Sequence, residues 1–249
     1  MNEYLKIFIM SLTILSIRIY GMEHHHQKYC VIQRKAARYM VSKLFFRDNE
    51  KVLCIGCDYG KIKQKYSYLK FIDYVEVVEP CIRYKGLWGY DKVLLFFSWQ
   101  LLKNPCQIFT DSSRLLKSEG RLCGIVPYYK SLYFDVYYQT RTHDAWKDRY
   151  NKKMEITLCG SKQVKTWLEK AGLTDIECRI VNKPFTFKTK EKFARWIMSS
   201  PEQFVGISEK YQQAFVNDIV SNYMECCSIA QDQPIKLHLP YMIVSGYKI

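Results

Sequence analysis

Hydrophobic and polar residues follow two alternating patterns along the chain. Short apolar runs of strand length occur at residues 51–55, 74–78, 91–97, 121–127 and 175–181. Between them, apolar residues recur three and four positions apart at residues 27–46, 61–69 and 161–172, and a further helix is expected at residues 111–120, which finish at Gly120. The first pattern predicts strands and the second predicts amphipathic helices. Their regular alternation is typical of an α/β protein with a mostly parallel sheet.

The individual stretches carry boundary signals that sharpen this prediction. Residues 91–97 are almost wholly apolar, which is typical of a central strand buried on both faces. Ser161 is expected to cap the helix that Gly172 ends. Two further helices are expected at 189–198 and 208–224, and a final strand at 235–249 is broken by Pro240. We therefore predict an α/β three-layer sandwich in one domain.

Residues 128–150 are dense in tyrosine and show no strand alternation. We expect them to form a mainly helical cap over the carboxyl ends of the strands. Open α/β sheets bind their ligands at that end.

The amino terminus contains an apolar run at residues 7–17, which is too short to span a bilayer as a helix. It is either a signal-peptide core or part of an extension that precedes a start at Met22. We therefore divide the chain into residues 1–21, which are signal-like or an extension, and a domain at 22–249. The expected location is cytoplasmic, or secreted if residues 1–21 are a signal peptide, and no membrane span is expected.

Charge and cysteine content narrow the expected partners. The formal net charge is +14, from 38 Lys and Arg against 24 Asp and Glu, which favours an anionic partner. No run of five basic residues occurs, so a solvated basic surface is favoured over nucleic-acid binding. Several of the ten cysteines fall within apolar strands, where a free thiol behaves as a small hydrophobic group. Cys54 and Cys57 form one CxxC pair without a second pair, and the adjacent histidines at 24–26 lack spaced partners, so no metal is expected.

The segment "KVLCIGCDYGK", residues 51–61, joins a predicted strand to a predicted helix through a turn that contains Gly56 and Gly60. Glycines at such a junction allow a nucleoside ligand to approach the backbone. Glu79 follows Gly60 by nineteen residues, at the end of the second predicted strand. An acid at this distance is placed to accept hydrogen bonds from both ribose hydroxyls.

From residue 27 onward, the order of motifs resembles the class I S-adenosylmethionine-dependent methyltransferases. The branch with the most similar motifs acts on small molecules and includes juvenile-hormone-acid and trans-aconitate methyltransferases. "VLCIGCDYG" is similar to the first motif of the family, "VVEP" to its ribose-binding acid and "DKVLLFFSWQLLKN" to its fourth-strand motif. "LLKSEGRL", "WLEKAGLTDIECRI" and "PFTFKTKEKFARWI" are similar to later blocks, so the resemblance covers roughly nine tenths of the chain. It implies a Rossmann-like class I methyltransferase fold, with S-adenosyl-L-methionine as cofactor.

The sequence also departs from the family pattern. Cys54 stands where an acid normally opens the first motif, and Asp58 replaces a glycine of the turn. Asp tolerates left-handed backbone conformations better than most residues, so the turn can still form. The interval between Glu79 and Asp91 is too short for another helix and strand, because a whole βαβ unit needs about 30 residues. We therefore expect the third strand of the family to be missing.

The resemblance implies a set of site residues. Cofactor contacts are expected from Gly56, Cys57, Asp58, Gly60, Glu79 and Phe97. Gln100 occupies the region where relatives carry a His, and it either orients an acceptor oxygen as the catalytic residue or is a plain loop residue. Acceptor contacts are expected from Trp99, Tyr128, Tyr133 and Arg141, with core packing or surface charge as their alternative roles.

The expected function is methyl transfer to a small-molecule acceptor, such as a carboxylate, which is nucleophilic without a general base. The family accelerates this in-line displacement mainly through proximity and orientation. The alternative is a degenerate relative that keeps the fold and serves as a binding or scaffold protein.

Overall fold

The computed structural model describes residues 31–56, 71–75, 88–96, 104–128, 130–149, 159–199 and 207–249. Their main feature is a six-stranded sheet with the order β2-β1-β3-β4-β8-β5. Its strands are β2 (Phe71–Val75), β1 (Lys51–Ile55), β3 (Tyr90–Leu95), β4 (Leu116–Pro127), β8 (Tyr241–Lys248) and β5 (Leu173–Val181). A separate two-stranded sheet pairs β6 (Pro184–Phe187) with β7 (Ile235–His238).

The parallel part of the large sheet has the predicted arrangement. β1 pairs in parallel with β2 on one side and with β3 on the other, and β3 pairs in parallel with β4. β8 runs antiparallel to both β4 and β5. β1 therefore lies inside the sheet and, among the described residues, β2 lies at its edge, so the predicted, mostly parallel sheet is confirmed. Residues 76–87 lie outside the described part of the chain, and with them most of the interval in which we expect a missing strand.

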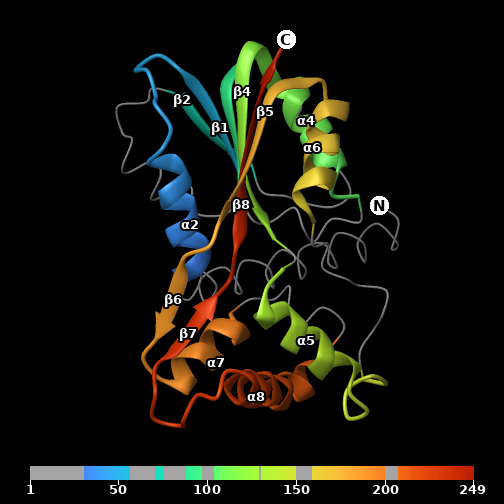
Figure 1. Ribbon diagram of the computed structural model, residues 1–249. Coiled ribbons are helices and arrows are strands. Elements are labelled where there is room, and N and C mark those ends of the chain that lie inside the picture. The colour runs from blue at the N-terminus through green and yellow to red at the C-terminus, as the bar shows by residue number, and fades with distance from the viewer. Residues whose placement is uncertain are drawn as a thin grey trace, which may run out of the picture.

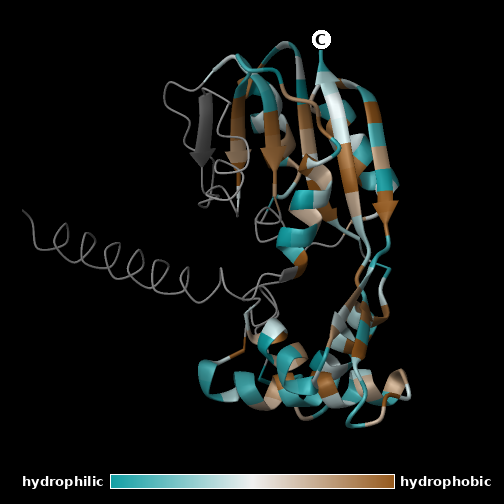
Figure 2. Cartoon of the chain, turned by 90° about the vertical axis from the view of Figure 1, so that its left-hand side faces the viewer, coloured by the Kyte–Doolittle hydropathy of each residue, from teal (hydrophilic) through white to brown (hydrophobic). Residues whose placement is uncertain are grey.

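Helices cover both faces of this sheet, so the predicted three layers are present (Figure 1). α2 (Val31–Val41) covers one face, and α4 (Gln107–Leu115) and α6 (Ser161–Lys170) cover the other. Strand residues alternate between the two hydrophobic clusters, because successive side chains point to opposite faces. Val52 and Cys54 belong to the cluster on the α2 side, whereas Leu53 and Ile55 belong to the cluster on the α4 and α6 side. Apolar residues accordingly dominate the central strands (Figure 2).

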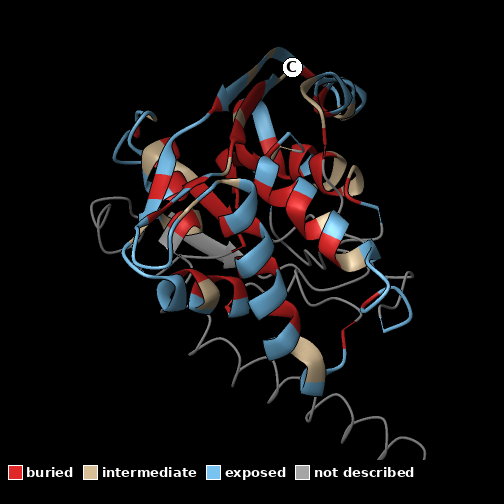
Figure 3. Cartoon of the chain, turned by 60° about the horizontal axis from the view of Figure 1, so that its bottom comes forward, coloured by how far each residue is buried: buried red, intermediate tan, exposed pale blue. Residues whose placement is uncertain are grey.

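A second part of the molecule lies beyond the carboxyl ends of the parallel strands (Figure 1). It contains α5 (Leu132–Thr142), α7 (Lys190–Met198), α8 (Glu209–Cys226) and the β6–β7 pair. Figure 3 shows that its helices combine buried and exposed faces. Their buried residues join the α2-side cluster, so one hydrophobic core extends from the sheet into this part.

Several boundaries differ from those that the sequence predicted. The helix expected to end at Gly120 ends at Leu115, and β4 begins at Leu116. The glycine at 120 was a misleading sign of a helix end, because residues 116–120 already belong to β4. The pairing of β3 with β4 is irregular between Tyr90 and Lys92, and Glu119 has a φ of 62°. A Cβ atom at Gly120 would lie 2.9 Å from the carbonyl oxygens of Lys117 and Tyr90, so this glycine allows a close backbone approach rather than ending a helix.

Smaller corrections concern α6, β2 and the carboxyl terminus. Gly160, not Ser161, is the residue before the first helical position of α6, and it makes no side-chain cap. Gly172 follows the helix with a φ of +76°, as its predicted role requires. β2 begins at Phe71, three residues before the predicted start. The break at Pro240 is confirmed, because it separates β7 from β8, which belong to different sheets.

Within the described residues, no helix is both long enough and apolar enough to cross a membrane.

Candidate functional site

The strand order places a topological switch point between β1 and β3. From β1 the chain continues to β2 on one side, and the next strand, β3, lies on the other side of β1. The strands that follow β1 and β3 in the chain, β2 and β4, therefore lie on opposite sides of the β1–β3 pair. In open α/β sheets, the crevice at such a switch point is where ligands bind.

Gly56 lies at this point, directly after β1. Its φ is +105°, which side-chain-bearing residues rarely adopt, and it is buried. The Phe96 backbone N–H donates a 2.8 Å hydrogen bond to the Ile55 carbonyl oxygen, so β1 and β3 remain joined up to the switch point. A glycine in this conformation gives a ligand close access to the backbone, which fits the adenosine part of the expected cofactor.

Cys54 is the first departure from the family pattern that the structure describes. Its side chain is buried on the α2 side, and burial raises the pKa of its thiol to about 12. A neutral thiol cannot replace the carboxylate that normally opens this motif. Cys123 on β4 is buried as well, and burial raises the pKa of its thiol to about 11. Both residues therefore pack as small hydrophobic groups, as the sequence predicted.

The cap begins where β4 ends and is tied to the sheet through backbone contacts. The Tyr128 N–H donates to the Pro240 carbonyl oxygen at 3.3 Å, and Tyr128 forms an isolated parallel bridge with Cys159. Ser131 is the N-cap of α5. Its hydroxyl accepts from the Tyr133 N–H at 3.2 Å and donates to the His238 carbonyl oxygen at 3.1 Å. The predicted helical cap beyond the carboxyl end of β4 is confirmed for residues 132–142 (Figure 1).

The cap residues that we expected at the acceptor site lie in different environments. Tyr128 is half-buried at the junction between β4 and α5. Tyr133 is fully buried. The centroid of its ring lies 5.3 Å from that of Trp196 and 6.2 Å from that of Phe193. Arg141 lies in the last turn of α5, with its guanidinium carbon 5.2 Å from the centroid of the Tyr138 ring. The structure therefore places Tyr133 in the hydrophobic core, and its role toward an acceptor stays a prediction.

The remaining predicted site residues all lie outside the described part of the chain. They are Cys57, Asp58, Gly60, Glu79, Phe97, Trp99 and Gln100. Their assignments remain predictions. In the described ranges, no group of three or more His, Cys, Asp and Glu side chains is placed to hold a metal ion.

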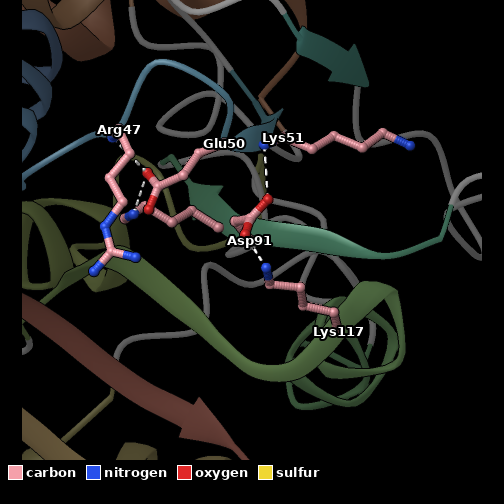
Figure 4. Close-up of polar contacts among 6 residues, drawn as sticks. Arg47, Glu50, Lys51, Asp91 and Lys117 are labelled. Carbon is pink, nitrogen blue, oxygen red and sulfur yellow. Dashed lines mark hydrogen bonds and ion pairs between the residues drawn. The ribbon is translucent and has the colours of Figure 1, made fainter.

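A charged network that the motifs did not reveal lies at the opposite, amino end of β1 and β3 (Figure 4). The Asp91 carboxylate accepts a 2.8 Å hydrogen bond from the Lys51 backbone N–H and pairs with the Lys117 ammonium. The Glu50 carboxylate pairs with the Lys92 ammonium and accepts from the Arg47 N–H at 3.1 Å.

Partial burial of the Asp91 carboxyl raises its pKa, but the hydrogen bonds from Lys117 and Lys51 outweigh this effect. The net result is a pKa below the ordinary value. This network stabilises the strand ends that lie farthest from the candidate site.

Comparison with known proteins identifies the fold. No family model matches the chain. The YcgJ protein of Bacillus subtilis superposes with a TM-score of 0.55 at 10% identity, and covers 86% of this chain and 98% of its own. A protein of Bacillus halodurans C-125, solved as a "putative methyltransferase", also gives 0.55 at 16% identity, and covers 85% and 98%. The chain has the class I methyltransferase fold.

Among curated proteins, "Putative methyltransferase 235L" of Invertebrate iridescent virus 6 is 20% identical over 213 residues. The match covers 77% of this chain and 80% of the viral protein. The printed description of this relative agrees with the predicted methyltransferase class. The scaffold alternative gains no support from the comparisons.

Proposed function

We propose that this protein is an S-adenosylmethionine-dependent methyltransferase that acts on a small-molecule acceptor. The observation that carries the proposal is the turn at Gly56. Gly56 lies at the switch point of the sheet in a chain with the methyltransferase fold, and its left-handed φ and burial suit close contact with a nucleoside. The predicted partners of Gly56 in this role are Gly60 and Glu79.

The proposed acceptor site lies between the carboxyl ends of the strands and α5. Supporting this, β4 leads directly into the cap, and Ser131 fixes the start of α5 against the end of β7. Tyr128 lies on this connection, and we propose that it contacts the acceptor. For an acidic acceptor, we propose that Arg141 pairs with its carboxylate.

The bound cofactor supplies a methyl group on a positively charged sulfur, which is a good leaving group. An acceptor carboxylate attacks this carbon without first losing a proton, so the chain needs no general base. The task of the protein is then to align the acceptor oxygen with the reacting bond and to exclude water, which is catalysis by proximity. We propose that Gln100 orients the acceptor oxygen through its side-chain amide.

Calorimetric titration of the purified chain with S-adenosylhomocysteine tests the proposal. Cys54 and Asp58 depart from the family pattern, so we expect weak but measurable binding. Gly56→Val should abolish it, because a branched side chain fills the space that the ligand needs and disfavours the left-handed backbone.

Gly89→Val is the matched control. Gly89 also has a positive φ, of +73°, but it lies at the amino end of β3, and a Cβ atom there would meet no other atom within 4 Å. Both variants introduce backbone strain of the same kind, and only the first should lose binding. No heat from the unmodified chain at millimolar ligand, or equal losses in both variants, would contradict the proposal.

A further inference from the structure

Three basic side chains surround Tyr39, where α2 meets the end of β5. The Lys183 Nζ lies 3.9 Å from the centroid of the Tyr39 ring, and the Lys43 Nζ lies 5.8 Å from it. The Arg179 guanidinium carbon is also 5.8 Å away, and one of its nitrogens donates to the Tyr39 hydroxyl at 3.5 Å. We name Tyr39, Lys43, Arg179 and Lys183 the Tyr39 cation cluster. All three of its cations are exposed.

Among the described residues, no acidic side chain neutralises the positive charge of the Tyr39 cation cluster. In the part of the chain that the structure describes, none of its three cations forms an ion pair with an acidic side chain. Residues 31–47 contain five basic residues, residues 178–190 contain four, and neither segment contains an acid. The acid closest to Arg179 in the sequence, Glu177, lies 3.8 Å from Arg121 in an ion pair of its own. This face therefore attracts anions.

An exposed aromatic side chain follows Lys43 of the cluster by two residues in the sequence. Phe45 is 78% exposed, and it lies between Lys43 and Arg47 in the loop that follows α2. An exposed apolar ring flanked by cations suits the boundary between lipid headgroups and acyl chains.

We propose that the Tyr39 cation cluster and Phe45 form a docking surface for membranes that contain anionic phospholipid. The cations are drawn to the negative surface potential, and the Phe45 ring enters the headgroup region. A nucleic acid would satisfy the cations alone, because a phosphate backbone offers no apolar contact to Phe45. The exposed Phe45 ring therefore favours a membrane.

Vesicle co-sedimentation of the full chain tests this docking surface. The probes are vesicles of phosphatidylcholine alone and vesicles that also contain about 30% phosphatidylserine, a composition that creates a negative surface potential. We expect binding to the anionic vesicles only, and release in high-salt buffer, because salt screens the attraction. Failure of the unmodified chain to bind anionic vesicles, or equal binding to both compositions, would overturn the proposal.

Two matched variants locate the surface. Replacement of Lys43, Arg179 and Lys183 by Gln should weaken binding to the anionic vesicles by about a hundredfold, since each basic residue near such a surface contributes about 1 kcal/mol. The control replaces three exposed lysines of α6 by Gln, which removes the same charge: Lys162, Lys165 and Lys170. The control should retain most of the binding. Equal losses in the two variants would overturn the proposal.

Two further measurements distinguish an anionic membrane from a nucleic acid as the partner of this surface. Phe45→Ser should weaken vesicle binding several-fold without lowering stability, because Phe45 is exposed. Binding to a single-stranded RNA oligonucleotide, measured in parallel, should be weaker than vesicle binding at the same salt concentration. Tight RNA binding that depends on the cluster, together with no effect of Phe45→Ser on vesicles, would instead assign the surface to nucleic acid.

Discussion

The two ends of the parallel strands are stabilised by different interactions. At the amino end, Asp91 and Glu50 pair with Lys117 and Lys92, so charged side chains satisfy one another within the protein. At the carboxyl end, β1 is followed by Gly56, which has no side chain, and a second part of the molecule packs beyond the strands through apolar contacts. The same strands are therefore fixed by charged side chains at one end, whereas at the other β1 leads into a buried glycine with a φ that other residues rarely adopt.

The largest expected effect concerns the apolar core beyond the carboxyl end. Tyr133→Ala removes a fully buried ring that contacts Trp196 and Phe193, and should lower the free energy of unfolding by about 3–5 kcal/mol. Urea unfolding measures this loss. Leu132→Ala, at the exposed neighbouring position, is the control and should cost less than about 1 kcal/mol.

This variant also tests the acceptor role that we expected for Tyr133. If the ring lines the acceptor pocket instead of the core, Tyr133→Ala will leave stability nearly unchanged and raise the KM for the acceptor. That result would also place the acceptor pocket deeper in the cap than we propose.

The next effect concerns the ion pair at the amino end. Lys92 and Glu50 are 11% and 13% exposed, so Glu50→Ala leaves a mostly buried ammonium without its partner. We expect a loss of about 3 kcal/mol in the free energy of unfolding, measured in urea. The double variant Lys92→Met, Glu50→Leu should recover most of it, because no charge remains buried. A double variant less stable than Glu50→Ala would contradict this account.

A smaller effect is expected for Glu79, whose replacement should weaken ligand binding at the carboxyl end without changing the stability of the fold. If Glu79 accepts hydrogen bonds from the ribose, Glu79→Ala should weaken S-adenosylhomocysteine binding by about 1–3 kcal/mol, since ligand hydroxyls lose their partner. Calorimetry measures the loss, and the urea midpoint should not change. Equal affinity of the two proteins would show that the ribose assignment is wrong.

The strands β1 and β3 and the glycine that follows β1 were easier to predict from the sequence than the ion pairs at the amino ends of these strands. The apolar runs at 51–55 and 91–97 and the turn at Gly56 give local signals, because burial on both faces and a left-handed φ restrict the residue types at a position. The pairing of Asp91 with Lys117 depends instead on how β4 lies against β3, where the register shifts after Tyr90. A long-range register of this kind leaves no periodic signal in the sequence. The early start of β4 was missed for the same reason.

The placement of Tyr133 was also beyond local reasoning. Tyrosines at 128, 129, 133 and 137 look alike in the sequence as walls for a pocket. The structure separates Tyr128, which is half-buried, from Tyr133 and Tyr137, which are buried in the core. That difference arises because α7 and α8 pack against one face of α5, and the sequence of α5 alone does not identify the face.

The smallest expected effect is a pH dependence at the amino end. Partial burial raises the pKa of Asp91, but hydrogen bonds from Lys117 and the Lys51 N–H outweigh it and hold the pKa below its ordinary value. The ionised carboxylate therefore stabilises the fold above the unfolded-state pKa of about 3.9. This contribution is lost as the pH falls through the lower folded-state pKa, because the folded protein must then bind a proton.

Asp91→Asn should accordingly cost about 1.5–2 kcal/mol at pH 7, the lower end of the range for a hydrogen bond to a charged group, and the loss should shrink below about pH 4. Urea unfolding of the two proteins across this pH range measures the difference. Asp144→Asn is the control, because Asp144 is 87% exposed and its pair with Lys147 lies at the surface, so its loss should stay below about 0.5 kcal/mol. A difference for Asp91→Asn that stays constant from pH 7 to about pH 3 would mean that the charge of Asp91 does not stabilise the amino end. The contrast between the two ends would then rest on Glu50 and Lys92 alone.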